Sequence, residues 1–177
     1  MDTNVFISKL KSDDPYNSEA ETIIVNLEKG DEIQAETSVL TLLETAAVAG
    51  RLYHARMGQE DEDGRQIFVA KTIKMLAGLK IRFIHLPGDA PLPLGNAQIT
   101  MPSIFNESIL LSIQANAPLR TLDLIHVAAA RHAKQTNHKL GAFVTGDSDL
   151  LSKKNHLSKI IGMPILTPRE YVDGLGL

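Results

Sequence analysis

The sequence has no cysteine among its 177 residues. Disulfide bonds, zinc sites made of thiolates and cysteine nucleophiles are therefore excluded. It also lacks an apolar run near the length that crosses a bilayer, and it shows no signal-peptide pattern. We therefore expect a cytoplasmic protein with no membrane partner.

A strong excess of either charge is missing too. Lys and Arg number 18 against 21 Asp and Glu, which gives a formal net charge of −3. Proteins that read long stretches of nucleic acid usually present a broad basic surface, and this composition argues against one. A nuclease whose carboxylates bind metal stays open, because acids neutralised in that way would no longer repel a phosphate backbone.

Signatures of three common enzyme classes are absent as well. The chain contains no G-x-x-x-x-G-K-[ST] phosphate loop, no G-x-S-x-G nucleophile elbow and no G-x-G-x-x-G dinucleotide fingerprint. His126 and His132 stand six residues apart, on different faces of a helix, so they do not form a zinc pair. His126 lies one turn after Asp123 and could approach that acid, but a histidine at the edge of the core is the favoured interpretation.

What is present is an alternation of helices and strands. Hydrophobic residues make up 44% of the chain and charged residues 22%, values typical of a globular protein, and the length suits one domain over residues 1–177. Helices are predicted over 18–29, 38–56, 66–79, 103–115 and from 121 onward, with a last short one after Thr167. Strands are predicted over 81–86, 143–144 and 163–166. This order predicts an α/β fold in three layers, α/β/α, around a central parallel sheet.

Five local predictions accompany these elements. Ser18 and Glu21 form a capping-box pattern, and Thr37 or Ser38 is the expected cap of the second helix. Residues 60–63, EDED, are predicted to be a solvated loop. The Pro- and Gly-rich residues 87–98 are predicted to be a long loop that serves as an arm or a lid. The residues that the second helix is expected to bury are Val39, Leu42, Leu43 and Ala46.

Two acids, Asp147 and Asp149, closely follow the predicted strand 143–144 in the stretch FVTGDSDL. In parallel α/β sheets, ligands bind outside the carboxyl ends of the strands, and these carboxylates are expected there. The ordinary alternatives are a turn residue at 147 and a first-turn helix acid at 149.

Three acids from elsewhere in the chain could join them. Asp2 precedes an apolar run, Glu44 has apolar residues one turn before and after it, and Asp123 falls in the first turn of a helix. Taken singly, they can be a solvated terminal acid, a side chain that snorkels from the core edge, and a helix cap. Taken together, converging carboxylates repel one another unless a hard divalent cation such as Mg²⁺ or Mn²⁺ binds between them. Sites of that kind hydrolyse phosphodiesters by activating water.

The stretches DTNVFI, SVLTLLE, LRTLDLIHVAAA and FVTGDSDLL, in this order and in these contexts, resemble a PIN domain, and most of all the VapC-type toxin ribonucleases. The resemblance covers nearly the whole chain. It implies an endoribonuclease that cleaves RNA phosphodiesters with Mg²⁺ or Mn²⁺. It further implies that the protein is the toxin of a toxin–antitoxin pair, with a small antitoxin protein as partner, and that it forms a homodimer.

Carried over residue by residue, the resemblance assigns four catalytic acids, three metal ligands among them, and three supporting residues. The catalytic acids are Asp2, Glu44, Asp123 and Asp147, the metal ligands are Asp2, Asp123 and Asp147, and the supporting residues are Asn4, Thr145 and Asp149. The four acids are expected to point into one pocket at the carboxyl edge of the sheet.

The start of the chain departs from this family, whose members begin with an apolar strand that ends at the first acid. Here only Met1 precedes Asp2, so we expect either a start further upstream or a sheet with one strand fewer. A non-catalytic PIN module that binds RNA or a protein is therefore the main alternative. A receiver-like signalling domain ranks last, because it needs a lysine beyond a late strand, and MPILTPRE offers only Arg169 there.

Overall fold

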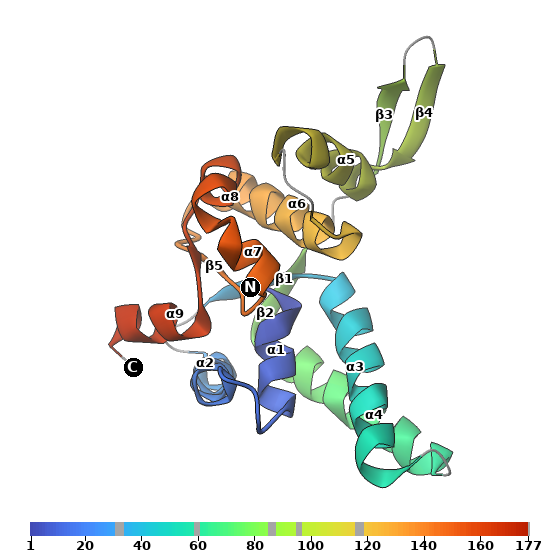
Figure 1. The fold of residues 1–177 in the computed structure, drawn as a ribbon, viewed down its shortest axis with the longest axis vertical. Helices are drawn as coiled ribbons and strands as arrows, with labels where there is room; N and C mark the ends of the chain where they lie inside the picture. Colours follow the sequence, from blue (N-terminus) through green and yellow to red (C-terminus); the bar gives the residue numbers. More distant parts are fainter. Residues whose placement is uncertain (31–33, 59–60, 85–87, 95–96, 116–118, 177) are drawn as a thin grey trace.

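The computed structural model describes residues 1–30, 34–58, 61–84, 88–94, 97–115 and 119–176. In this part the chain is a mixed α/β protein with far more helix than strand (Figure 1). In chain order the elements are α1 (Thr3–Leu10), α2 (Asn17–Lys29), β1 (Ala35–Ser38), α3 (Leu40–Met57), α4 (Glu62–Gly78), β2 (Ile81–Ile84), β3 (Asp89–Leu94), β4 (Ala97–Pro102), α5 (Ser103–Ala115), α6 (Thr121–Thr136), β5 (Phe143–Val144), α7 (Ser148–Ser152), α8 (Lys154–Ile161), β6 (Ile165–Leu166) and α9 (Pro168–Leu175).

The strands form three separate pairs rather than one sheet. β1 runs parallel to β2, β5 runs parallel to β6, and β3 and β4 form an antiparallel hairpin. The two parallel pairs agree with the predicted direction of the strands. A single central sheet between two helical layers is not formed by the described residues, since no strand joins β1 to β5.

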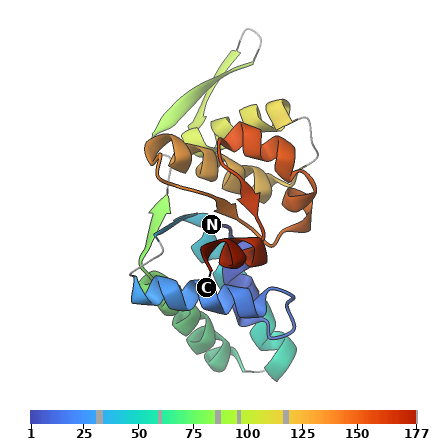
Figure 2. The same ribbon diagram turned by 90° about the vertical axis from the view of Figure 1, so that its left-hand side faces the viewer.

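The first two residues of the chain lie between the parallel pairs. The Met1 nitrogen donates to the Glu36 carbonyl oxygen of β1 at 2.7 Å, and the Asp2 amide donates to the Val144 carbonyl oxygen of β5 at 2.9 Å. The N-terminus therefore sits at the centre of the molecule, between the part that holds α5, α6 and α8 and the part that holds α1 to α4 (Figures 1 and 2). Asp2 is well held at this position.

Helix α1 anchors this start in the core. Asp2 is its N-cap and accepts from the Thr3 amide, which satisfies one of the free donors of the first turn. Val5 then packs into a cluster with residues of α2, β5 and α9, while Phe6 packs into a second cluster with Ile24 and Leu76. Complete burial of Phe6 alone contributes about 2–3 kcal/mol of hydrophobic stabilisation. A third cluster lies between α6, α8, β5 and β6.

Most of the predicted helices are confirmed, but the capping box predicted for α2 is wrong. α2 ends at Gly30, whose φ of 73° is left-handed. Its N-cap is Tyr16 rather than Ser18, and Glu21 pairs with Lys9 of α1 instead of closing a capping box. At the other end of the chain, Thr167 and Glu170 do form the capping box of α9, with a proline at its start.

The predicted buried face of α3 is wrong for two of its four residues: Leu43 is 68% exposed and Val39 is 42% exposed. Leu42 does pack against the cluster of Phe6, and Ala46 is half-buried. The fully buried residues of the helix are Thr41, Thr45, Ala49 and Gly50. The reason is a tertiary contact, since Thr41 exchanges hydrogen bonds with hydroxyls of α1 and β1. Residues 37 and 38 belong to β1, which the sequence pattern did not predict. Ser38, one of the two expected caps of this helix, does accept from the Leu40 amide at its start, at 3.2 Å, although Val39 holds the N-cap position.

Two predicted loops are regular structure. The acids 61–63 begin α4, where the Asp61 side chain caps the helix by accepting from the Gly64 amide; residue 60 lies outside the described part. Most of the segment 87–98 lies in the β3–β4 hairpin, which projects away from the rest of the molecule as an arm (Figure 1). The prolines of this hairpin are compatible with edge strands, because a residue there does not need a backbone amide hydrogen that donates to a neighbouring strand.

In the described ranges no helix is both long and apolar enough to cross a membrane.

Candidate metal centre

Asp147 stands three residues beyond β5, at the start of α7. Its Oδ1 accepts from the Asp149 amide at 2.8 Å and from the Leu150 amide at 3.1 Å, which makes it the N-cap of that helix. Its own amide donates to Thr145 Oγ1 at 3.0 Å. The turn after the strand is thus closed by side chains, and it fixes the Asp147 carboxylate at the carboxyl end of β5.

Three carboxylates meet at this point. Asp123 in the first turn of α6, Asp147 and Asp149 each offer an oxygen, and these oxygens lie within 4.8 Å of one another. All three residues are half-buried. The first turns of two helices therefore converge here, and their free amides favour negative charge. Carboxylate oxygens at this spacing form a donor set suited to a hard divalent cation.

The pKa of Asp123 is affected by burial and by the negative charges near it. Partial burial raises its pKa above the ordinary value, and the charges of Asp147 and Asp2 raise it further. The amide of Arg120, which donates to Asp123 Oδ2 at 3.3 Å, opposes this rise without cancelling it. The Arg120 guanidinium lies 3.4 Å from Asp149 Oδ2, but it is largely exposed, so water screens most of its effect.

Asp2 lies beneath this cluster and is only 2% exposed. Its carboxylate accepts three hydrogen bonds, from the Thr3 amide at 2.8 Å, Thr145 Oγ1 at 2.6 Å and Asn4 Nδ2 at 3.2 Å. The Asn4 amide nitrogen also lies 3.5 Å from Asp147 Oδ2, so it stands between the two acids. Asn4 and Thr145 thus hold Asp2 in place, as the supporting role assigned to them requires.

Glu44 approaches the same region from α3. Its Oε2 accepts from Thr3 Oγ1 at 2.5 Å and lies 2.6 Å from His126 Nε2. Burial alone would raise the pKa of Glu44, but the hydrogen bonds from His126 and Thr3 outweigh it, and the pKa lies below its ordinary value.

His126 joins Glu44 to Asp2. The ring is buried, and its other nitrogen, Nδ1, lies 3.9 Å from Asp2 Oδ1. Burial lowers the pKa of His126, but the bond to Glu44 and the charges of Asp2 and Glu44 outweigh that effect and raise it. His126 is therefore buried at the core, as predicted, and it also contacts the predicted site.

The predicted site residues are brought into one network, with a division inside it. Asp2, Asn4, Thr145 and Asp147 are linked by hydrogen bonds, and Asp123 joins them through the group of three carboxylates. Among the residues that the structure describes, His126 and Thr3 are the ones that connect Glu44 to Asp2. The resemblance assigns Asp2, Asp123 and Asp147 as the metal ligands. In the described part of the chain, the three carboxylates that lie close together are Asp123, Asp147 and Asp149, so Asp149, to which the resemblance assigned a supporting role, takes the place of Asp2.

Sequence reasoning missed two contributors and undervalued one. Thr3 touches both Asp2 and Glu44, and Arg120 faces Asp123 and Asp149; neither position carries a pattern of its own. The signal for His126 was its spacing, because one helical turn after Asp123 puts it on the same face of α6.

Three comparisons with known proteins were negative. No protein-family model matches the chain, and neither a curated protein nor a solved structure matches it.

Proposed function

We propose that this protein is a metal-dependent endoribonuclease of PIN type, and that it acts as the toxin of a toxin–antitoxin pair. The observation that carries the proposal is the cluster of Asp123, Asp147 and Asp149 just beyond the end of β5, with Asp2 directly beneath it. The resemblance of the four motif stretches supports the choice of RNA as substrate.

The residues fit a divalent cation. The donors are carboxylate oxygens, which Mg²⁺ and Mn²⁺ prefer. Burial and then the charges of Asp147 and Asp2 raise the pKa of Asp123, and a cation would oppose both effects. Asp123, Asp147 and Asp149 would hold the ion, and Asp2 would contribute its charge from below. When bound, such an ion supplies Lewis-acid chemistry, activating water and neutralising the phosphodiester.

The other residues of the network position these acids. Thr145 and Asn4 fix the Asp2 carboxylate, so that its charge lies close to Asp123. His126 and Thr3 hold Glu44, the second acid assigned by the resemblance, in its ionised form. Arg120, exposed at the rim, is placed to attract a phosphate of the substrate.

The proposal includes a central sheet that joins the two parallel strand pairs. We take residues 1–177 as a single PIN-like domain, in which β2, β1, the segment at Met1–Asp2, β5 and β6 form one central parallel sheet between two helical layers. Two observations support it: both strand pairs are parallel, and Met1 and Asp2 hydrogen bond to the facing edges of β1 and β5.

The proposed partners follow from the toxin assignment. They are RNA as the substrate, a small antitoxin that blocks the acids, and a second copy of the chain in a homodimer; the proposed location is the cytoplasm. For the homodimer the support is a group of exposed apolar side chains on α5, formed by Phe105, Ile109, Leu110 and Ile113.

A second candidate function is a non-catalytic PIN module that binds RNA or a protein. The observation that favours it is the saturation of Asp2, whose carboxylate already accepts three hydrogen bonds from the chain itself. The receiver-like alternative loses support, because Arg169 pairs with Glu19 of α2 on the surface, at 2.7 Å.

An RNA cleavage assay with purified protein separates the two functions. The native chain is expected to cleave single-stranded RNA with Mn²⁺ and not with a chelator, and Asp147→Asn is expected to abolish that cleavage. Asp63→Asn is the matched control, because Asp63 is an exposed acid in the first turn of α4, away from the cluster. Binding of RNA without cleavage under any metal condition would support the non-catalytic module instead.

A further inference from the structure

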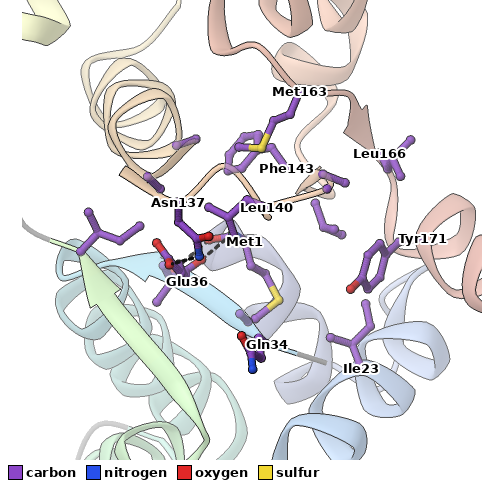
Figure 3. A pocket seen from close by; sticks show the side chains of 18 of the residues that line it. Met1, Ile23, Gln34, Glu36, Asn137, Leu140, Phe143, Met163, Leu166 and Tyr171 are labelled. Carbon is purple, nitrogen blue, oxygen red and sulfur yellow. Dashed lines mark hydrogen bonds between the residues drawn. The ribbon is translucent and has the colours of Figure 1, made fainter. Parts of the chain in front are cut away.

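The candidate metal centre borders a small cavity. Its volume is about 200 Å³, and Asp147 is part of its wall, together with Gly146 and Ser148. A cavity of about 570 Å³ that lies between β1 and β5 is lined by residues such as Leu140 and Phe143 (Figure 3), and none of the three clustered acids is among the described residues of its wall. The smaller cavity therefore has the position that a subsite for the substrate requires.

One face of α1 forms a second wall of the small cavity. The residues that line it are Asn4, Ile7, Ser8 and Lys11, and residues three or four positions apart share one side of a helix. Asn4 stands at the Asp147 end of this row, where its Nδ2 lies 3.5 Å from Asp147 Oδ2. Lys11 follows about two helical turns later, roughly 10 Å further along at 1.5 Å per residue. The cavity thus extends from an acid of the candidate metal centre to a lysine.

The loop between α1 and α2 forms the third wall, with Asp14, Pro15 and Tyr16. Hydrogen bonds fix this loop: the Tyr16 amide donates to Asp14 Oδ1 at 3.0 Å, and the side chain of Asn17 donates to three carbonyl oxygens at the end of α1. The Tyr16 ring is half-buried and lies against Gly146, where a Cβ atom would be 3.2 Å from Cδ2 of the ring. A side chain at position 146 would therefore push the ring aside.

Lys11 brings a positive charge to this cavity. The residue is half-buried, and among the residues that the structure describes its ammonium group has no ion-pair partner. Asp14 also lines the cavity, and its Oδ1 accepts from the Tyr16 amide. Lys11 is therefore available to an anionic group of a ligand.

The size and the lining of the cavity suit a nucleobase. Pockets for drug-sized ligands measure about 300–1,000 Å³, so the smaller volume here leaves room for a single flat ring system. Tyr16 and Ile7 offer apolar surface, and Lys11 offers a cation. Proteins bind single-stranded RNA by the same combination, in which an aromatic side chain packs against a base and a basic side chain binds the backbone.

We propose that this cavity binds one base of a single-stranded RNA substrate, with the base against the Tyr16 ring and a phosphate of the backbone at Lys11. The adjoining phosphate of the same strand then lies toward Asp147 Oδ2, because the two amides at the start of α7 donate to the other oxygen, Oδ1. The inference rests on the proposed function for the choice of RNA, and it deepens that function by adding two substrate-binding residues that lie outside the four motif stretches. Because every base has a π-face, the cavity is expected to accept different bases.

The test measures binding of RNA apart from its cleavage. One probe is a fluorescein-labelled single-stranded RNA of six adenosines, and the second probe is the same ribose-phosphate backbone without bases. Both are titrated with the full chain in Ca²⁺ by fluorescence anisotropy, and a gel checks that the RNA stays intact. The native chain is expected to bind the complete RNA at least about tenfold tighter than the backbone, as is typical of a base stacked on an aromatic side chain.

Tyr16→Leu is expected to lower the affinity for the complete RNA about tenfold and to leave the affinity for the backbone unchanged. Tyr16→Phe keeps the ring and is expected to bind like the native chain, as is the matched control Tyr53→Leu on α3. An equal loss of affinity for both probes in Tyr16→Leu, no loss for either, or no binding by the native chain would overturn the proposal.

Two further variants locate the site. Gly146→Ala displaces the Tyr16 ring and is expected to weaken binding of the complete RNA but not of the backbone. It keeps the test decisive if thermal melting shows that Tyr16→Leu does not fold. Lys11→Ala is expected to weaken binding of both probes and to lower the salt dependence by about one phosphate contact, whereas Lys71→Ala on the exposed surface of α4 changes neither. An unchanged affinity and salt dependence in Lys11→Ala would contradict the phosphate contact.

Cleavage of the same RNA with Mn²⁺ separates this inference from the proposed function. If the native chain cleaves RNA and Tyr16→Leu binds both probes as the native chain does, the base subsite is wrong and the ribonuclease stands. If the native chain binds the base through Tyr16 and does not cleave, the ribonuclease is wrong and the base subsite stands.

Discussion

Two acids of the same network, Glu44 and Asp123, are held in opposite ways. Glu44 has a histidine and a hydroxyl as partners, and its pKa is lowered. Asp123 is surrounded by the carboxylates of Asp147, Asp149 and Asp2, and its pKa is raised. Both are partly buried, so burial does not explain the difference. The first acid is paired with donors of the protein, while the second lies among other acids, and a bound cation is the partner that we propose for it.

The largest expected effect is on cleavage by Asp123→Asn. Replacing an anionic ligand by a neutral one weakens a cation held chiefly by charge, so RNA cleavage should fall by at least about 100-fold. The metal-induced rise in melting temperature, expected for a cation that binds only the folded state, should shrink with it. Assays of cleavage and of melting with and without Mn²⁺ measure both.

Asp63→Asn should leave both quantities unchanged. A helix cap is the competing explanation for Asp123, and Asn caps about as well as Asp. Undiminished cleavage and an unchanged metal-induced shift in Asp123→Asn would therefore leave Asp123 as a cap and nothing more.

The next largest effect is on stability, from Glu44→Gln. It removes the charged partner of a buried histidine, and because Glu44 keeps 21% of its side chain exposed, the cost should be roughly 2 kcal/mol rather than the larger value of a fully buried pair. Denaturant unfolding measures it. Glu28→Gln, on the exposed face of α2, should change the free energy of unfolding by less than about 0.5 kcal/mol.

The pH dependence of the Glu44→Gln effect has a definite sign. His126 has a raised pKa in the folded state, so its contribution is complete below its ordinary pKa of 6.5 and is lost as the pH rises through the raised value. Glu44 has a lowered pKa, so its contribution is complete above 4.5 and is lost at lower pH. The free energy of unfolding of the native chain should therefore exceed that of Glu44→Gln most between pH 4.5 and pH 6.5. A difference that does not change from pH 5.5 to pH 9 would contradict the pairing.

The smallest expected effect is the change in the free energy of unfolding caused by Asp123→Asn in the absence of metal. Removing one repelling carboxylate should stabilise the metal-free fold by a few tenths of a kcal/mol up to about 1 kcal/mol at pH 7, because the cluster is half-exposed and water screens it. The gain should fade as the pH drops, since Asp123 in the native chain then becomes protonated and neutral. Melting curves in chelator at pH 7 and pH 4.5 measure it. A loss of stability at pH 7 would contradict this prediction, because it would show that the favourable contacts of Asp123 outweigh its repulsion by the other carboxylates.

Features that depend on neighbours in the sequence were predictable. The capping box of α9, the helix from Thr121 and the placement of Asp147 beyond a strand all follow from local patterns, and the structure has them. The grouping of Asp123 with Asp147 followed from strand direction combined with the resemblance.

Features that depend on distant partners were not predictable. The buried face of α3 is set by Thr41, which bonds to residues of α1 and β1 rather than following the apolar pattern of its own helix. The pairing of Glu44 with His126 joins residues 82 positions apart. β1 is a short strand, Ala-Glu-Thr-Ser, with no alternation to mark it, and its pairing with β2 defines it.

The most direct test of the metal centre is the pKa of the Asp123 side chain, followed by carbon NMR of its labelled carboxyl group with and without Mg²⁺. Without the cation, the pKa should lie above the ordinary value of 3.8, because burial and the charges of Asp147 and Asp2 disfavour ionisation. With saturating Mg²⁺ it should fall clearly below the value without the cation, and the same titration of Asp63 should not move. A pKa of Asp123 that Mg²⁺ leaves unchanged would contradict the assignment of this cluster as a metal site.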